Sequence, residues 1–171
     1  MQVGSQSMDL LTGALNESAL RERFQQAKSS NELRVSCVAM VDIDDLHFFN
    51  EKFGHSTGDH VVRTLGRLLH REFEPPSSIY RCGGDEFLIL VEGLDPLVAK
   101  ERFGHLFDSL RNWRSEGFAL SSVAPAAQWT CSVGLTDGFS TLAEGMSQAA
   151  LLLHAAKKTG KAKLVAHIAD T

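Results

Sequence analysis

Apolar residues recur along the chain with two different spacings, and these spacings predict the secondary structure. Stretches with apolar residues every three or four positions predict helices, which we expect at residues 16–27, 46–52, from 56 towards 75, 96–113 and 142–158. Shorter, mostly apolar runs predict strands, which we expect at residues 34–41, 78–80, 87–91, 117–122, 128–136 and 163–168. Helices interspersed with strands around one central hairpin indicate an α+β domain.

Capping residues mark several of the expected helix ends. Asn16 and Asp95 precede helical stretches and are typical N-cap residues. Ser56 and Asp59 have the spacing of a capping box, with Asp in place of the usual Glu or Gln. Gly160 follows the last expected helix and is typical of a helix end.

The sequence Arg-Cys-Gly-Gly-Asp-Glu-Phe at residues 81–87 places a glycine pair between two apolar runs. This pattern predicts a hairpin with a type I′ turn, because both central positions of that turn need φ > 0. Asp85 and Glu86 follow the turn, where little side-chain bulk surrounds them. Such carboxylates suit a divalent cation with a phosphate chain, although the motif alone equally fits a surface hairpin with solvated acids.

A second group of carboxylates follows the strand expected at residues 34–41. Asp42 and Asp44 are two residues apart, so strand alternation places them on the same face. If the two acidic segments are neighbours, charges about 4 Å apart repel by roughly 4 kcal/mol at an effective dielectric near 20. The group therefore needs a cation, a proton or separation, and magnesium with substrate phosphates fits best. A solvated strand end is the alternative.

Together these segments resemble a GGDEF domain, the catalytic module of diguanylate cyclases, which condense two GTP molecules into cyclic di-GMP and release pyrophosphate. The resemblance covers residues 8–171 and leaves residues 1–7 as a linker or cloning remnant. It rests on the motifs Asp42-Ile43-Asp44, Asn50, Phe53-Gly54-His55, Gly58-Asp59 and the Gly-Gly-Asp-Glu-Phe turn. It implies a palm-like, mixed and mainly antiparallel sheet flanked by helices, similar to class III nucleotide cyclases.

The resemblance assigns metal ligands and catalytic groups to the two acidic segments. It implies that the Asp42 side chain, the Ile43 carbonyl and Asp85 bind Mg²⁺ or Mn²⁺. Glu86 acts as a further ligand or as the base toward the attacking 3′-hydroxyl, and Gly83-Gly84 contacts the substrate. Strand alternation would aim Asp85 and Glu86 at opposite faces, so the sequence leaves open which of them binds metal.

The same resemblance implies that Asp59 and Asn50 bind guanine, whose adjacent N–H donors a carboxylate can accept. Gly54 and Gly58 would let the backbone turn tightly between these two residues. The alternatives are a structural role for Asp59 at a helix start, where an acid favours the dipole, and for Asn50 as an ordinary helical residue.

Lys157 and Lys161 correspond to the family's ligands for the β- and γ-phosphates, and lie one turn apart if the helix continues. The alternative is that they only complete a helix C-terminus. Phe48 and Phe49 correspond to positions that approach the triphosphate through their main chain, although an aromatic pair is equally typical of a core.

Several positions depart from the family pattern. Family members often carry Lys at the position of His47, Arg at Glu17 and Asn at Ala162, while Lys161 stands where Arg is usual. Lys offers a point charge rather than a bidentate fork. These changes remove no metal or base contact, but they concern the positioning of phosphates and of the N-terminal turn.

The product-inhibition motif of the family, Arg-x-x-Asp, is replaced by Glu74 and Ser77 with two prolines between them. Glu74 would repel the phosphates that Arg attracts. We therefore predict no product-inhibition site at these positions.

Composition adds bounds on class and location. The chain has 171 residues, is 43% hydrophobic and carries a formal net charge of −4, which indicates one globular domain and gives no reason to expect nucleic-acid binding. Cys37, Cys82 and Cys131 match no zinc site and indicate reduced thiols in a cytoplasmic protein. No apolar stretch is long enough to span a bilayer. Because GGDEF domains usually follow a sensory or membrane-bound segment, we expect an excised catalytic domain, whose parent is then sensory or membrane-attached, or a short stand-alone protein.

The chemistry implied by the resemblance requires two subunits, since each GTP attacks the other, so a homodimer is the expected catalytic form. A catalytically silent GTP-binding or scaffold module is the main alternative. A cyclase for another purine nucleotide is a further one.

Overall fold

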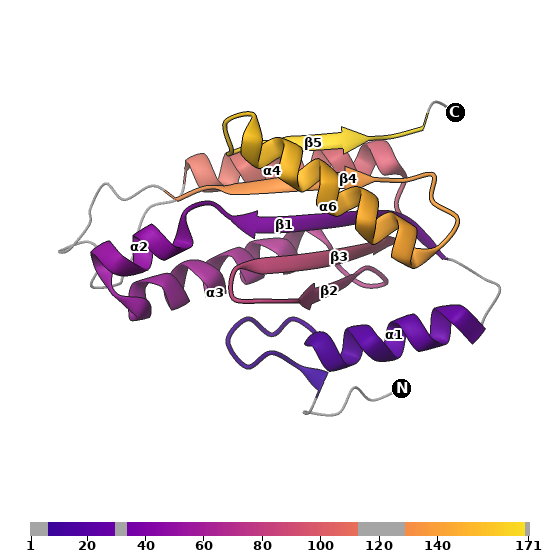
Figure 1. Ribbon diagram of the computed structural model, residues 1–171, viewed down its shortest axis with the longest axis horizontal. Coiled ribbons are helices and arrows are strands. Elements are labelled where there is room, and N and C mark those ends of the chain that lie inside the picture. The colour runs from indigo at the N-terminus through magenta and orange to yellow at the C-terminus, as the bar shows by residue number, and fades with distance from the viewer. Residues whose placement is uncertain (1–6, 30–33, 113–128, 170–171) are drawn as a thin grey trace.

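The computed structural model describes residues 7–29, 34–112 and 129–169, which form one five-stranded sheet with helices on both faces (Figure 1). The strands are β1 (Val35–Ile43), β2 (Ser78–Arg81), β3 (Glu86–Glu92), β4 (Cys131–Thr136) and β5 (Leu164–His167). The helices are α1 (Glu17–Ser29), α2 (Leu46–Phe53), α3 (His55–Glu72), α4 (Pro96–Arg111) and α6 (Leu142–Lys158).

The sheet has the strand order β2-β3-β1-β4-β5, with β1 at its centre. Neighbouring strands are antiparallel except for β4 and β5, which are parallel. This arrangement confirms the expected α+β class with a mixed, mainly antiparallel sheet.

Strand alternation divides the apolar residues of β1 between two cores. Ala39 and Val41 pack toward α3 and α4 in the larger core. Val38 faces the opposite side, where it packs with residues of α1 and α6. Because both faces of β1 are covered, the strand reads as an almost continuous apolar run rather than a strict alternation.

Helix α6 lies against the sheet over β4 and β1, as seen in front of the sheet in Figure 1. Gly134 of β4 permits this contact, because a Cβ atom there would lie 2.1 Å from the carbonyl oxygen of Ala149. The backbone of the helix therefore sits directly on the strand. This close packing fixes where the C-terminal end of α6 meets the sheet.

The helix caps are partly as predicted. Asn16 Oδ1 accepts a hydrogen bond from the Ala19 amide at 3.1 Å, and Asp95 Oδ1 accepts one from the Leu97 amide at 2.8 Å. The capping box at Ser56 is wrong, because α3 already begins at His55 after Gly54, with no side-chain cap. The strand expected at 117–122 lies outside the described residues, as do positions 113 and 128 at the edges of two other expected elements.

Two further observations concern the apolar length of the helices and the state of the cysteines. Within the described ranges, no helix has both the length and the apolar character required to cross a bilayer. Cys37, Cys82 and Cys131 are all free thiols.

Candidate functional site

The end of β1 and the β2–β3 turn lie side by side at one end of the sheet. Asp42 is paired with Glu86 in the register of β1 and β3. The Ile43 amide donates a hydrogen bond to the Asp85 carbonyl oxygen at 3.3 Å. The structure thus brings together the two acidic segments that the sequence singled out.

Asp42 is the buried member of this group, with 3% of its surface exposed. Burial raises the pKa of its carboxyl to about 6; the Lys157 ammonium acts in the opposite direction, and the charges of Asp85 and Glu86 add to the rise. Lys157 Nζ lies 2.5 Å from Asp42 Oδ1. This short contact is an ion pair between the ammonium and the buried carboxylate.

The donors at this end of the sheet fit a magnesium ion that is completed by substrate. Among the described residues, no cluster of three or more His, Cys, Asp or Glu side chains is arranged to hold a metal alone. Mg²⁺ typically takes one or two protein carboxylates and completes its shell with phosphate oxygens and water. The buried Asp42 carboxylate, together with Asp85 and the Ile43 carbonyl, matches that donor set.

The β2–β3 turn differs from the type I′ turn that we predicted. Neither Gly83 nor Gly84 has a left-handed backbone. The Cys82 amide donates to the Glu86 carbonyl oxygen at 2.9 Å, so Asp85 belongs to the turn and not to the strand. Strand alternation therefore does not separate Asp85 from Glu86, and both carboxylates influence Asp42. A Cβ atom on Gly84 would meet nothing within 4 Å, which leaves an open surface over the turn.

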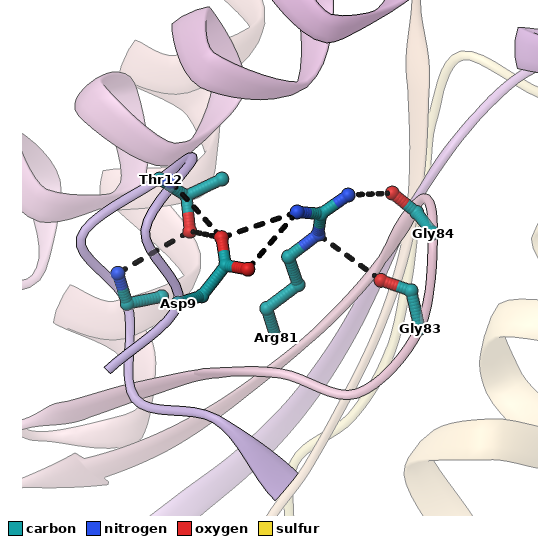
Figure 2. A network of polar contacts seen from close by, with 6 residues as sticks. Asp9, Thr12, Arg81, Gly83 and Gly84 are labelled. Carbon is teal, nitrogen blue, oxygen red and sulfur yellow. Dashed lines mark hydrogen bonds and ion pairs between the residues drawn. The ribbon is translucent and has the colours of Figure 1, made fainter. Parts of the chain in front are cut away.

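Arg81 joins this turn to the segment before α1, as Figure 2 shows. Its guanidinium donates to the carbonyl oxygens of Gly83 and Gly84 at 3.1 and 2.7 Å. It also binds both carboxylate oxygens of Asp9 at 3.1 Å. Asp9 in turn accepts hydrogen bonds from the amide and hydroxyl of Thr12 at 3.0 and 2.6 Å.

The electrostatics of Asp9 reflect these partners. Burial by itself would raise the pKa of the Asp9 carboxyl, but the hydrogen bonds from Thr12 and Arg81 outweigh it and lower the pKa. Sequence reasoning missed this link, because the partners are 72 positions apart.

Asn50 and Asp59 lie on either side of the junction between α2 and α3. Asn50 Oδ1 is buried without a hydrogen-bond partner among the described residues, whereas Asp59 is exposed. Gly54, with φ of 86°, makes the turn between the helices. Gly58 does not turn the chain as we expected, because it lies inside α3; a Cβ atom there would lie 1.7 Å from Asn50 Oδ1. Its role is to leave room for Asn50.

Lys157 and Lys161 both reach the acidic end of β1, but not from one continuous helix. Helix α6 ends at Lys158, and Lys161 lies in the following turn with φ of 60°. Lys161 Nζ lies 2.6 Å from Asp45 Oδ1. Each lysine is therefore held by a carboxylate that follows or ends β1.

The two phenylalanines of α2 have different environments. Phe49 is 8% exposed and belongs to the larger core, while Phe48 is 62% exposed. Lys52 Nζ lies 5.9 Å from the centre of the Phe48 ring. Phe48 is thus the member of the pair that is open to a ligand.

Asp44 was expected on the same face as Asp42, and the structure gives it internal partners. Its carboxylate is 8% exposed. Oδ1 accepts a hydrogen bond from Ser132 Oγ at 2.7 Å, and Oδ2 accepts from Thr130 Oγ1 at 2.7 Å and from the Ala162 amide at 3.0 Å. This residue connects β1 with β4 and with the turn that follows α6.

The positions that depart from the family pattern have local partners. His47 Nε2 lies 3.2 Å from a carboxylate oxygen of Glu51, and Glu17 pairs with Arg21 at 3.0 Å. Glu74 is exposed.

Ser77 is buried and its hydroxyl accepts a hydrogen bond from the Glu92 amide at 3.2 Å. The position that holds Asp in the inhibition motif is therefore engaged with β3.

Comparison with known proteins places these features in a family. A family profile described as "Diguanylate cyclase, GGDEF domain" matches residues 6–163. The diguanylate cyclase DgcP of Pseudomonas aeruginosa is 30% identical over 166 residues, which cover 91% of this chain and 23% of DgcP. The diguanylate cyclase DgcZ of Escherichia coli K12 is 35% identical over 114 residues, which cover 65% of this chain and 38% of DgcZ.

The fold has a close counterpart among solved structures. The GGDEF domain of DgcB from Caulobacter crescentus, solved in complex with c-di-GMP, superimposes with a TM-score of 0.82 at 24% identity. The match covers 97% of this chain and 98% of that domain. The chain thus spans a whole domain of this fold but less than two fifths of either curated cyclase.

Proposed function

Because the chain belongs to the GGDEF family, we propose that it is an active diguanylate cyclase that condenses two GTP molecules into cyclic di-GMP and releases pyrophosphate. The observation that carries this proposal is the buried Asp42 carboxylate, which lies beside the Asp85–Glu86 turn and within 2.5 Å of the Lys157 ammonium. Acids and a cation concentrated at one sheet end suit a metal-bound triphosphate.

In this proposal Asp42, the Ile43 carbonyl and Asp85 hold Mg²⁺ or Mn²⁺, which neutralises negative charge on the triphosphate when bound. Glu86 either completes that ligand set or accepts the proton of the attacking 3′-hydroxyl. The open surface over Gly84 admits the phosphates.

The nucleotide is oriented by groups outside the acidic cluster. Asp59 accepts hydrogen bonds from the guanine edge, and Asn50 offers its unsatisfied oxygen and its amide beside it. The main chain at Phe48 and Phe49 approaches the triphosphate.

Lys157 and Lys161 bind the β- and γ-phosphates. For this they leave Asp42 and Asp45, with which they pair at 2.5 and 2.6 Å. The negative charge of the phosphates would then take the place of the carboxylates as partner of the two lysines, and Asp42 would be free to hold the cation.

The reaction requires a homodimer. Each 3′-hydroxyl attacks the α-phosphate held by the partner, so two subunits face each other across a two-fold axis.

Product analysis by mass spectrometry tests this proposal. Concentrated protein incubated with GTP and Mg²⁺ should yield cyclic di-GMP and pyrophosphate, whereas the Asp85→Ala variant should yield neither. Competition with ATP adds a specificity arm, because Asp59→Ala should lose the preference for GTP. Absence of both products from the wild-type protein contradicts the proposal.

A silent GTP-binding module is the second candidate, favoured by the departures at His47 and Ala162 and by the lysine that already neutralises Asp42. Measuring GTP affinity beside turnover separates the two. A silent module binds GTP and releases no pyrophosphate at any protein concentration.

A further inference from the structure

Three successive features of the acidic segment each contact the C-terminal end of α6 or the turn after it. Asp42 pairs with Lys157 at 2.5 Å, and Asp45 pairs with Lys161 at 2.6 Å. Asp44, between them, accepts a hydrogen bond from the Ala162 amide at 3.0 Å. Residues 42–45 thus contact residues 157–162 through two ion pairs and one hydrogen bond from a backbone amide to a carboxylate.

The three contacts differ in how easily a ligand can replace them. The Lys157 and Lys161 side chains are 36% and 41% exposed, so phosphates in the site can draw both ammonium groups away from their carboxylates. Asp44 is 8% exposed and binds a main-chain amide that cannot swing away. Its carboxylate is also fixed by the hydroxyls of Ser132, which is fully buried, and Thr130.

The turn that Asp44 holds needs such support. Lys161 and Ala162 have φ of 60° and 50°, so two successive residues other than glycine adopt a left-handed backbone. Side chains with a Cβ atom disfavour this conformation, and it persists only where surrounding contacts fix it. The bond from the Ala162 amide to Asp44 is such a contact, and it lies one residue after Lys161.

We propose that Asp44 is a positioning residue for the triphosphate: it keeps the turn after α6 in the conformation that presents Lys161 to the phosphates once the ion pair between Lys161 and Asp45 is broken. The inference rests on the proposed nucleotide site. It extends that proposal to a residue that touches neither nucleotide nor metal. Asp44 acts only through the turn.

Binding measurements with two guanine nucleotides test this role. The first is guanosine α,β-methylene triphosphate, which carries the β- and γ-phosphates, and the second is GMP, which lacks them. Both are titrated into the protein with Mg²⁺ present, and chemical shifts are followed by NMR. Asp44→Ala should lower the affinity for the triphosphate analogue at least tenfold and leave that for GMP within twofold.

Two variants control for a purely structural effect. Asp44→Asn keeps an oxygen that can accept from the Ala162 amide and the Thr130 hydroxyl, while its NH₂ group can donate to the Ser132 hydroxyl. Its affinities should therefore stay within threefold of wild type. Thr130→Val with Ser132→Ala removes the other two bonds to Asp44 without touching the turn. This control should lower the melting temperature but keep the ratio of the two affinities.

An equal loss for both nucleotides in Asp44→Ala, or no loss for either, overturns the inference. Should Asp44→Ala fail to fold, hydrogen exchange on the wild-type protein decides: the Ala162 amide should be protected at least tenfold, and an unprotected amide overturns the inference. Wild-type protein that binds neither nucleotide defeats the proposed function itself, which is a distinguishable result.

Discussion

Asn50 carries a buried side-chain oxygen that has no hydrogen-bond partner among the described residues. A buried polar atom left without a partner costs about 1–3 kcal/mol of folding free energy. We propose that this residue binds guanine. Guanine binding would give the oxygen a partner and remove this cost, so the same free energy would add to the affinity for the nucleotide.

The raised pKa of Asp42 makes the stability of the metal-free protein depend on pH. The carboxyl titrates near 3.8 when unfolded and at about 6 when folded. Protonated Asp42 therefore favours the folded state fully below pH 3.8, and this contribution is lost as pH rises through about 6.

We expect the free energy of unfolding of Asp42→Asn minus that of wild type to increase by about 2 kcal/mol between pH 4 and pH 7. Urea unfolding at several pH values, with EDTA present, measures it. A difference that does not change with pH contradicts the assigned pKa.

Gly58→Ala should separate binding from stability. The new Cβ atom would lie 1.7 Å from Asn50 Oδ1, so the Asn50 side chain must rotate away. Helix propensity favours Ala over Gly by about 0.5–1 kcal/mol, which offsets the displacement of a flexible side chain. We expect stability close to wild type and GTP affinity reduced at least tenfold.

Gly104→Ala is the matched control, because Gly104 also lies inside a helix and a Cβ atom there meets nothing within 4 Å. It should raise stability slightly and leave GTP affinity unchanged. Unchanged affinity in Gly58→Ala would show that Asn50 does not contact the nucleotide.

At the scale of elements, the site depends on how α6 sits on the sheet. The helix crosses β4 at Gly134 and delivers Lys157 to the end of β1. The site exists only if three segments lie side by side: the end of β1, the β2–β3 turn and the end of α6. The β1–β3 and β1–β4 pairings and the packing of α6 on β4 and β1 set the positions of these segments.

Gly134→Ala should therefore be strongly destabilising. The added Cβ atom would lie 2.1 Å from the Ala149 carbonyl oxygen and 2.3 Å from the Leu153 amide nitrogen, both backbone atoms that cannot rotate away. We expect a loss of about 3 kcal/mol or more, as for other severe core substitutions, measured by chemical denaturation. Gly104→Ala serves again as the control. A loss below about 1 kcal/mol would mean that α6 is free to shift on β4.

The sequence predicts the helices and strands better than it predicts the turns between them. The helix at Leu142–Lys158, the caps at Asn16 and Asp95 and the mixed sheet follow from apolar spacing and local hydrogen-bonding residues. The turn at Gly83-Gly84 was mispredicted, because the expected geometry ignored the Arg81 guanidinium that binds its two carbonyl oxygens.

The site shows the same division. The sequence predicted that the two acidic segments converge on the condition that their strands are neighbours, and the β1–β3 pairing meets this condition. The partners of Asp44 lie 86, 88 and 118 residues away and come from three-dimensional packing alone. Strand alternation grouped Asp44 with Asp42, but no pattern in the sequence identified these partners.

At the scale of the whole molecule, the proposed chemistry makes activity depend on association. Two subunits, each with a bound GTP, have to associate, because one domain supplies only one of the two nucleotides. We expect the specific activity to rise with protein concentration until the dimer dominates, and a leucine-zipper fusion ahead of residue 7 to remove this dependence. Activity per subunit that stays constant down to nanomolar protein would contradict a reaction between subunits.

Product feedback is a second property of the whole molecule. Glu74 is exposed and acidic, and the Ser77 hydroxyl is already bonded to β3. We expect added cyclic di-GMP to leave the initial rate of pyrophosphate release unchanged at concentrations well above those of the enzyme. Inhibition that Glu74→Ala abolishes would contradict this prediction.

The guanidinium of Arg81 connects the segment before α1 to the β2–β3 turn, which lies beside the proposed catalytic residues. The Arg81 side chain links Asp9 to the carbonyl groups of Gly83 and Gly84, and backbone hydrogen bonds between Leu15 and β2 join the same two segments. A domain attached ahead of α1 could therefore move the turn beside Asp42 by displacing the segment around Asp9.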